Sequence, residues 1–534
     1  MISMPPFVEK YRWNILLGLT LVALLAIAWY HHFIQDDAFI SFRYAENLVS
    51  GKGLVWNPGE KIEGYTNFLW TILIAAGMLL RINPIGFSFA LGHIFLVVSL
   101  ILTYKTANLL LPSRSHALLT VILLGLNYTF SSYATGGLET QMQTSLLLAC
   151  CFLAIQSIIT RHWGTRRLVT LSSISALALL TRLDSSLICT VVFCFSMWYI
   201  LRENTEPRRK VQSLLLLLGP FAFVIGAWFV WKLTYYGNIL PNSFYIKVAT
   251  GSSLMHGLEY LYLFGLSYFL LPFPLIGFVT LESVFKNWSA PIALLLCIVL
   301  LWLGYVVKIG GDFMEFRFLV PILPMFFILI VWMMDTSIKD GYLRASLILL
   351  IVIGNLHHAY AFDYDPDHGI EPIHQLNGHL FDQDKNWIGI GKALGAAFED
   401  DTSITIATTA AGAIPYYSRL KTVDMLGIND KWIATSGYFI GFTPGHQRIA
   451  PFDYLVKCNV NIVISHPLVL SASERVRHVP FLPGMQEDAL SKTKVLEIPL
   501  DSVYRVIGLY LTPNPSVDQA IRKNGWAVRE VSAE

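Results

Sequence analysis

The stretch HHFIQDDAFISFRYAENLVSGKGLVWNPGEKIEGYTNFLW, residues 31–70, carries the pattern from which the fold can be worked out. It begins where a long apolar run ends, and it places two adjacent carboxylates, Asp36 and Asp37, at that boundary. Arg43 follows seven residues after Asp36, so the two side chains share one face if the segment is helical. Charged groups at the end of a membrane span are costly unless they line a wet cavity, so this cluster marks a functional site by default.

The composition shows what surrounds this cluster. The chain has 534 residues, of which 54% are hydrophobic, and only 14% are charged where a soluble domain has about 25%. Its mean hydropathy is +0.55. So much apolar surface cannot be buried inside one globule, and we therefore predict a polytopic α-helical membrane protein. The net charge of +2 is too small to indicate a nucleic-acid partner.

The first apolar run predicts an uncleaved span with its N-terminus in the cytoplasm. Lys10 and Arg12 precede the run, as in a signal peptide, but the run is too long and ends in Trp29 and Tyr30 instead of small cleavage-site residues. We predict about eleven spans in all, near 13–34, 84–111, 116–132, 138–160, 168–182, 186–201, 211–235, 262–281, 289–309, 316–335 and 343–360.

The orientation depends on one short apolar run, residues 66–80, which is shorter than the roughly 20 residues that a span needs. If this run lies along the membrane, the basic loops 161–167, 202–210 and 336–344 all face the cytoplasm, as the positive-inside rule requires. We therefore predict that the first-loop helices, about 36–80, lie parallel to the membrane. The N-terminus is then inside and the C-terminus outside.

The same orientation brings the polar loops together on the outer face. They contain the carboxylates and cations that chemistry would need, whereas the inner loops are short and basic. These outer stretches are 35–47, 131–141, 181–186, 235–247 and 308–318.

The composition changes near residue 361. The segments TSITIATT, NIVISHPLVL and YRVIGLYL are rich in β-branched residues and predict strands. We expect a transmembrane domain over 1–360 and an extracytoplasmic α/β domain over 361–534.

The carboxylate loop predicts a helix that starts at Asp36 and stops before Gly51 and Gly53. One interpretation is structural: an acidic residue in the first turn complements the helix dipole. The other is catalytic. Two close carboxylates push their pKa values apart, and a carboxylate base beside cations at the membrane surface suits the deprotonation of a hydroxyl while a lipid-borne phosphate leaves.

The other outer loops offer complementary groups. Glu139 and Asp312 stand beside glycine pairs that permit close backbone approach. The cations Arg182, Lys247 and Arg317 suit a phosphate, although anchoring at the headgroup layer explains each of them as well. Tyr245 suits stacking on a sugar or a place in the interfacial aromatic belt, and a histidine, His446, follows a Pro-Gly turn.

The first-loop motif, followed in order by GGLET, TRLD, PNSFYIK, GGDFMEFRFLVPILP, VDMLGIND and PGHQR, resembles the bacterial GT-C glycosyltransferases. Within these the chain is most similar to the terminal β-(1→2)-arabinofuranosyltransferase group. The resemblance implies a polyprenyl-phosphate sugar donor and first-loop helices along the membrane.

The resemblance also implies roles for individual residues. Asp36 would be the general base, and Asp37 its partner or a ligand of an optional divalent cation (Mg, Mn or Ca). Arg182, Lys247 or Arg317 would bind the donor phosphate, and Asp424 and His446 would reach the cavity from the C-terminal domain. Substrate binding is further expected of Arg43, Glu139, Asn242, Tyr245 and Asp312.

These observations predict an inverting transfer of a sugar, with arabinofuranose the first candidate, to an envelope glycan, lipid or surface protein. The site would face the periplasmic side of a bacterial inner membrane. The alternatives are a secondary transporter and a non-catalytic envelope or motility-control protein. Transporters, however, place ionisable groups near the midplane and often contain repeats, and no repeat is visible here.

Overall fold

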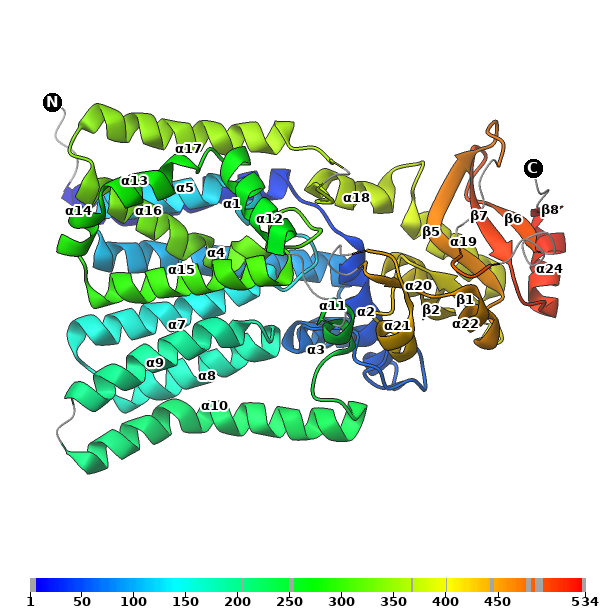
Figure 1. The fold of residues 1–534 in the computed structure, drawn as a ribbon, viewed down its shortest axis with the longest axis horizontal. Coiled ribbons are helices and arrows are strands. Elements are labelled where there is room, and N and C mark those ends of the chain that lie inside the picture. The colour runs from blue at the N-terminus through cyan, green and yellow to red at the C-terminus, as the bar shows by residue number, and fades with distance from the viewer. Residues whose placement is uncertain are drawn as a thin grey trace. The chain divides into compact units, whose positions relative to one another are not determined.

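Long helices make up most of the first two-thirds of the chain (Figure 1). The computed structural model describes residues 6–203, 206–248, 254–365, 368–399, 401–441, 446–476, 482–485 and 493–530. The chain divides into two compact units, each made of three segments. The helical unit comprises Met1–Phe33, Ser88–Val230 and Leu254–Ile370, and the α/β unit comprises Ile34–Phe87, Trp231–Ser253 and Glu371–Glu534.

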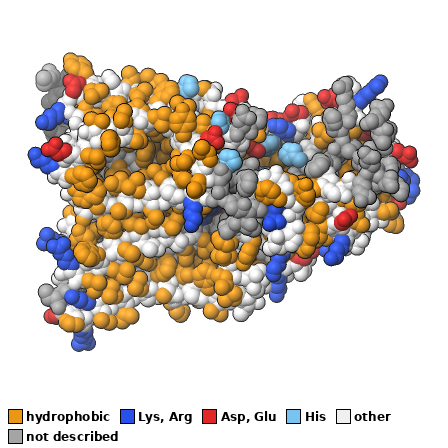
Figure 2. All heavy atoms as spheres, in the orientation of Figure 1, with side chains coloured by type: hydrophobic (Ala, Val, Ile, Leu, Met, Phe, Trp, Pro, Cys, Tyr) orange, Lys and Arg blue, Asp and Glu red, His pale blue; other side chains and the backbone are white. Residues whose placement is uncertain are grey.

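The helical unit is a bundle whose long helices run side by side (Figure 1). Figure 2 shows hydrophobic side chains over the sides of these helices, and Lys and Arg at the end where α1 begins. The elements are α1 (Pro6–Tyr30), α4 (Pro84–Leu110), α5 (Arg114–Leu126), α6 (Tyr128–Ser132), α7 (Thr140–Thr160), α8 (Thr165–Thr181), α9 (Ser185–Glu203), α10 (Pro207–Tyr236), α12 (Leu254–Ser267), α13 (Pro272–Val279), α14 (Leu281–Lys286), α15 (Ala290–Ile309), η1 (Arg317–Ile322), α16 (Leu323–Ser337) and α17 (Gly341–Ala361).

Among the described residues, eight helices are long and apolar enough to cross a membrane, or nine if the bent pair α12–α13 counts as one span. The run predicted as a span at 262–281 does not form one straight helix, because α12 and α13 are bent by 94°. Pro272 starts α13, and Phe269 between the two helices has a positive φ of 56°, so a straight helix is interrupted there. The expected total of about eleven would require the shorter helices α5 and α8, and it stays a prediction.

The run at 66–80 forms only a 12-residue helix, α3 (Phe68–Leu79). At 1.5 Å per residue its length is about 18 Å, well below the roughly 30 Å of the hydrocarbon core. This length agrees with the prediction that the segment does not cross. Its orientation along a membrane stays a prediction.

The α/β unit contains a mixed six-stranded sheet of order β2-β1-β5-β7-β6-β8. Strand β1 pairs in parallel with β2 and β5, and the remaining neighbours are antiparallel. The three segments predicted as strands contribute β1, β5 and β7. The strands are β1 (Thr405–Thr408), β2 (Lys421–Asp424), β5 (Ile462–Ser471), β6 (Lys494–Pro499), β7 (Tyr504–Tyr510) and β8 (Ala527–Glu530), with a separate pair β3 (Tyr438–Phe439) and β4 (Arg448–Ile449).

The first loop is part of this unit, so the boundary expected near residue 360 does not describe how the chain packs. Helix α2 starts at Asp36, as predicted, and its aromatic residues Phe39 and Phe42 pack against Tyr416. The helices of the unit are α2 (Asp36–Val49), α3, α11 (Asn242–Val248), α18 (Ile373–Phe381), α19 (Trp387–Phe398), α20 (Ala413–Ser418), α21 (Lys431–Ser436), α22 (Phe452–Lys457) and α24 (Pro515–Asn524).

A buried ion pair holds the first loop to the end of α10. Lys232 Nζ lies 2.8 Å from Glu63 Oε2, and the side chains are 0% and 5% exposed. The backbone carbonyl of Glu63 also accepts a hydrogen bond from Asn242 N at 2.8 Å. A buried pair of this kind contributes little net stability, but removing one partner leaves a buried charge.

Lys232→Ala is therefore expected to destabilise the protein by about 3–5 kcal/mol, whereas the double variant Glu63→Gln/Lys232→Met keeps most of the stability. Thermal unfolding in detergent micelles compares the two. A single variant with the wild-type melting temperature would contradict the structural role of the pair.

Candidate functional site

Asp36, the first residue of α2, is fixed by the start of another helix. Its Oδ2 accepts a hydrogen bond from Gly412 N at 2.9 Å, and its Oδ1 accepts one from Ala413 N at 2.7 Å. These amides lie at the beginning of α20. The structural interpretation from the sequence is that Asp36 complements the start of its own helix, α2. In the structure Asp36 instead accepts hydrogen bonds from the first amides of a different helix, α20.

Glycine at position 412 makes this approach possible. A Cβ on Gly412 would lie 1.9 Å from the backbone oxygen of Asp36 and 2.7 Å from its carboxyl carbon. No side chain fits there without separating α2 from α20. The motif AAGAIP around Gly412 is thus a contact motif, although its sequence resembles an ordinary strand–helix turn.

Arg43 holds the other end of the same segment. Its guanidinium donates to the carbonyls of Pro415 and Leu420, the latter at 2.8 Å. Further bonds go to the carbonyl of Trp56 and the amide oxygen of Asn57, and the guanidinium stacks 4.7 Å from the Trp56 ring. All of these contacts are internal to the α/β unit, which explains Arg43 as a structural clamp; substrate binding by Arg43 stays a prediction.

Burial raises the pKa of Asp36 to about 7. The hydrogen bonds from Ala413 and Gly412 oppose this change, the neighbouring charge of Asp37 adds to it, and His379 opposes it. Asp36 and Asp37 are both half-buried. A carboxylate that titrates near neutral pH is matched to proton transfer, which makes Asp36 a candidate base.

A second group near Asp36 was not predicted from the sequence. His379 on α18 lies 3.1 Å from Glu371 through Nε2 and Oε2, and its ring stacks on Trp387 at 4.6 Å between ring centroids. Burial opposes ionisation of Glu371, but the hydrogen bond from His379 and the electrostatic effect of His379, His446 and His466 together lower the pKa of Glu371. The richness of residues 361–385 in Asp and His was the one available signal.

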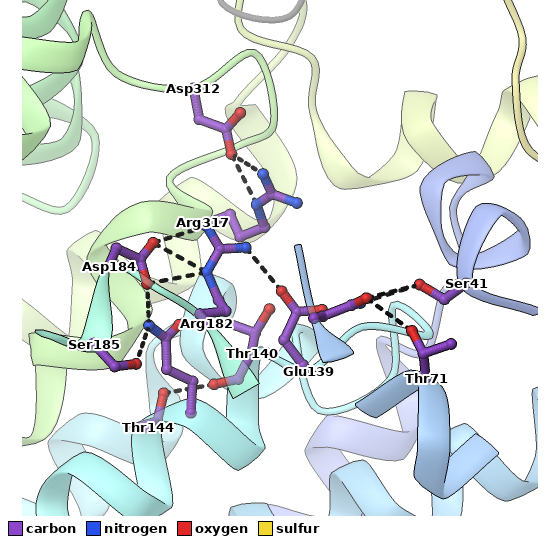
Figure 3. Close-up of polar contacts among 12 residues, drawn as sticks. Ser41, Thr71, Glu139, Thr140, Thr144, Arg182, Asp184, Ser185, Asp312 and Arg317 are labelled. Atoms are coloured by element: carbon purple, nitrogen blue, oxygen red, sulfur yellow. Dashed lines mark hydrogen bonds and ion pairs between the residues drawn. The ribbon is translucent and has the colours of Figure 1, made fainter. Parts of the chain in front are cut away.

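In the helical unit, Arg182 binds two carboxylates. Its guanidinium lies 2.8 Å from Glu139 Oε1 and 2.8 Å from Asp184 Oδ2 (Figure 3). Gln143 donates to Asp184 at 2.7 Å. The sequence predicted Glu139 and Arg182 as site residues, and the structure brings them into direct contact.

The predicted Asp312 and Arg317 form a second buried pair, 2.8 Å apart (Figure 3). Both groups of charges lie next to the same aromatic ring. The guanidinium groups of Arg182 and Arg317 are 5.5 and 5.1 Å from the centroid of the Phe318 ring. Asp312 Oδ1 is buried and has no hydrogen-bond partner among the described residues. It is therefore an acceptor suited to a ligand hydroxyl.

The glycine pair beside Asp312 has the role expected of it. Gly310 and Gly311 have φ of 85° and 79°, and a Cβ on Gly311 would lie 2.8 Å from the Tyr260 ring. The same loop carries Glu315, which accepts a hydrogen bond from Thr129 and is paired with His358 at 2.8 Å. The sequence did not predict this fully buried pair, because its members are 43 residues apart.

The remaining predicted residues lie mostly in the α/β unit. Asp424 is 1% exposed and accepts bonds from Leu426 and Asn429, and burial raises its pKa to about 6. Asn242 donates to the carbonyls of 427, 428 and 430 and so holds the DMLGIND loop. Tyr245 and His446 are half-buried. The side chain of Lys247, and residues 444–445 of the PGH motif, lie outside the described residues.

No group of three or more His, Cys, Asp or Glu side chains within the described part of the chain has an arrangement that would hold a metal ion. The optional divalent cation, with Asp36 and Asp37 as its expected ligands, stays a prediction.

Comparison with solved structures defines the class of fold. The crystal structure of ArnT from Cupriavidus metallidurans bound to undecaprenyl phosphate aligns with 93% of this chain and 98% of its own, at a TM-score of 0.56 and 10% identity. The apo oligosaccharyltransferase of Archaeoglobus fulgidus aligns with 94% of this chain and 75% of its own, at a TM-score of 0.51 and 11% identity. The chain is a polytopic helical membrane protein with the GT-C fold, which confirms the resemblance inferred from the sequence.

Sequence comparison narrows the similarity. The terminal β-(1→2)-arabinofuranosyltransferase of Corynebacterium glutamicum is 27% identical over 340 residues, 57% of this chain and 48% of that protein. The enzyme of the same name from Mycobacterium tuberculosis is 27% identical over 263 residues, which are 47% of this chain and 40% of that protein. This chain thus spans about half the length of these relatives or less. A family model described as a domain of unknown function (DUF8728) matches residues 377–509.

Gly412→Ala is expected to destabilise the protein by about 1–3 kcal/mol, because the new methyl group overpacks the contact with Asp36. Gly86→Ala is the matched control, since nothing lies within 4 Å of a Cβ there. Thermal unfolding of both variants is the measurement. Equal melting temperatures would show that α2 and α20 do not meet closely at Gly412.

Proposed function

We propose that this chain transfers a sugar, with arabinofuranose the first candidate, from a polyprenyl-phosphate donor to an extracytoplasmic glycan, lipid or protein acceptor. The observation that carries the proposal is the Asp36 carboxylate, fixed by two amides and shifted to a pKa of about 7. Two further findings support it: the names of the sequence relatives, and the undecaprenyl phosphate bound to the structural neighbour ArnT.

Asp36 acts as the general base in this proposal. One carboxylate oxygen takes the proton of the acceptor hydroxyl, and the acceptor oxygen forms a bond to the anomeric carbon of the donor sugar. The bond from that carbon to the phosphate oxygen breaks, and polyprenyl phosphate leaves with the electron pair. Each carboxylate oxygen has a second lone pair, so the bonds from Gly412 and Ala413 orient Asp36 without blocking it. A single displacement of this kind inverts the anomeric configuration.

In the structure Arg182 contacts Glu139 and Asp184, and Arg317 contacts Asp312. Asp312 Oδ1 would accept a hydrogen bond from a sugar hydroxyl. Following the sequence resemblance, the donor phosphate is assigned to Arg182, Lys247 or Arg317 as part of the proposal.

Asp36→Asn tests the base directly. We expect transfer to fall by about 10²–10⁴-fold, because the amide cannot accept the proton, while the protein stays folded. The assay combines purified protein, a synthetic short-chain polyprenyl-phosphate arabinofuranose and an arabinan acceptor, with products identified by mass spectrometry. Asp384→Asn, at an exposed carboxylate of the α/β unit, is the control.

Full activity in Asp36→Asn would refute the assignment of the base. A wild-type protein that forms no product would favour the transporter or the non-catalytic alternative. NMR of the product tests the displacement: retention of the donor's anomeric configuration would overturn the single step.

The transfer rate should also depend on pH. The base must be ionised, and the raised pKa of Asp36 means that its ionised fraction falls tenfold for each pH unit below about 7. We therefore expect kcat/KM to rise from acidic pH and to level off above about 7. A profile that is already flat between about pH 5 and 7 would contradict the burial of the catalytic carboxylate.

A further inference from the structure

A groove of about 380 Å³ lies in the α/β unit, between the end of α2 and the helices α19 and α20. Asp36 does not line it, and no role has been given to it above. Its volume is within the range of ligand sites, about 300–1,000 Å³. We propose that this groove binds a neutral oligosaccharide and is a subsite for the acceptor glycan, an inference that rests on the proposed function.

Small residues on α19 create the groove. A Cβ on Gly395 would lie 2.8 Å from the backbone oxygen of Tyr417, so α19 and α20 approach as closely as glycine permits. Ala396, the next residue, is exposed and lines the groove with only a methyl group. A larger side chain at 396 would fill the space without disturbing the buried contact.

The lining suits sugar rings. Tyr416 and Tyr417 are both half-buried, and although Phe39 contacts both rings and Lys392 lies 5.3 Å from the Tyr417 ring centroid, their exposed parts combine an apolar ring with a polar hydroxyl group. Around them lie two acids and two cations, namely Glu46, Glu399, Lys392 and Arg419. These formal charges cancel, which disfavours an anionic ligand such as a phosphate headgroup. The same groups supply both donors and acceptors for hydroxyls.

One buried group in the groove still needs a partner. The Ser418 side chain is 0% exposed, and its Oγ has no hydrogen-bond partner among the residues that the structure describes. Ser418 lines the groove. Buried hydroxyls are almost always hydrogen-bonded, so this one leaves a free hydrogen-bonding group in the wall of the groove.

The position of the groove agrees with an acceptor subsite. Helix α20 begins at the amides that bind Asp36 and ends at the groove residues Tyr416–Ser418. Its six residues span about 9 Å. A glycan whose terminal hydroxyl meets Asp36 can therefore extend along α20, with an inner residue of the chain in the groove.

Binding to the full-length protein in detergent tests the subsite independently of catalysis. The probe is a synthetic arabinofuranose oligomer, titrated calorimetrically without donor. We expect Ala396→Trp to weaken binding by about tenfold or more, whereas Ala527→Trp, at an exposed alanine of β8, leaves it unchanged. In the transfer assay, Ala396→Trp should raise the KM for the oligomer and leave kcat nearly unchanged.

The outcomes separate the subsite from the proposed function. Oligomer binding that Ala396→Trp abolishes supports the groove, even if no transfer is found. Unchanged affinity and KM in Ala396→Trp overturn the subsite while Asp36-dependent transfer stands. Tighter binding of a sulfated oligomer than of the neutral one, lost in Ala396→Trp, would also overturn the inference, because it would show a site for anions.

Discussion

The α/β unit depends on the contact between α2 and the segment 412–420. Asp36 accepts two backbone hydrogen bonds at the start of α20, and Arg43 donates to carbonyls at 415 and 420. Two turns of α2 separate these side chains, about 10 Å, which matches the length of the six-residue α20. The carboxylate of Asp36 meets the amide end of α20, and the guanidinium of Arg43 meets its carbonyl end. Both charges therefore complement the helix dipole.

This contact determines the environment of the candidate base. Asp36 is held by two backbone amides, and burial raises its pKa to about 7. The first loop is further tied to the sheet, because Asn57 exchanges hydrogen bonds with Thr422 on β2. A carboxylate with a rigid position and a near-neutral pKa is suited to accept a proton from a hydroxyl, and the same rigidity gives the neighbouring groove its walls.

In the helical unit, charged side chains pair with one another, whereas Asp36 and Arg43 of the α/β unit bind backbone groups. Two cations of the helical unit are held by carboxylates: Arg182 by Glu139 and Asp184, and Arg317 by Asp312, with both guanidinium groups close to the Phe318 ring. Such pairs keep charged groups tolerable next to an apolar bundle. The buried contact of Glu315 with His358 fixes the loop that carries Asp312. These groups are therefore ordered by the protein itself, before any ligand is considered.

The sequence by itself determined the features that depend on local pattern. Hydropathy gave the membrane class, the length of 66–80 gave a helix too short to cross, and periodicity gave α2 and three strands of the sheet. The acidic pair and its loop marked the candidate site. Only the tertiary structure decided what the side chains contact: Asp36 and Gly412 are 376 residues apart, and Arg43 and Leu420 are 377. The bend within 262–281, the pair of Glu315 with His358 and the groove beside α20 likewise depend on packing between distant segments, which the spacing of residues along one chain does not encode.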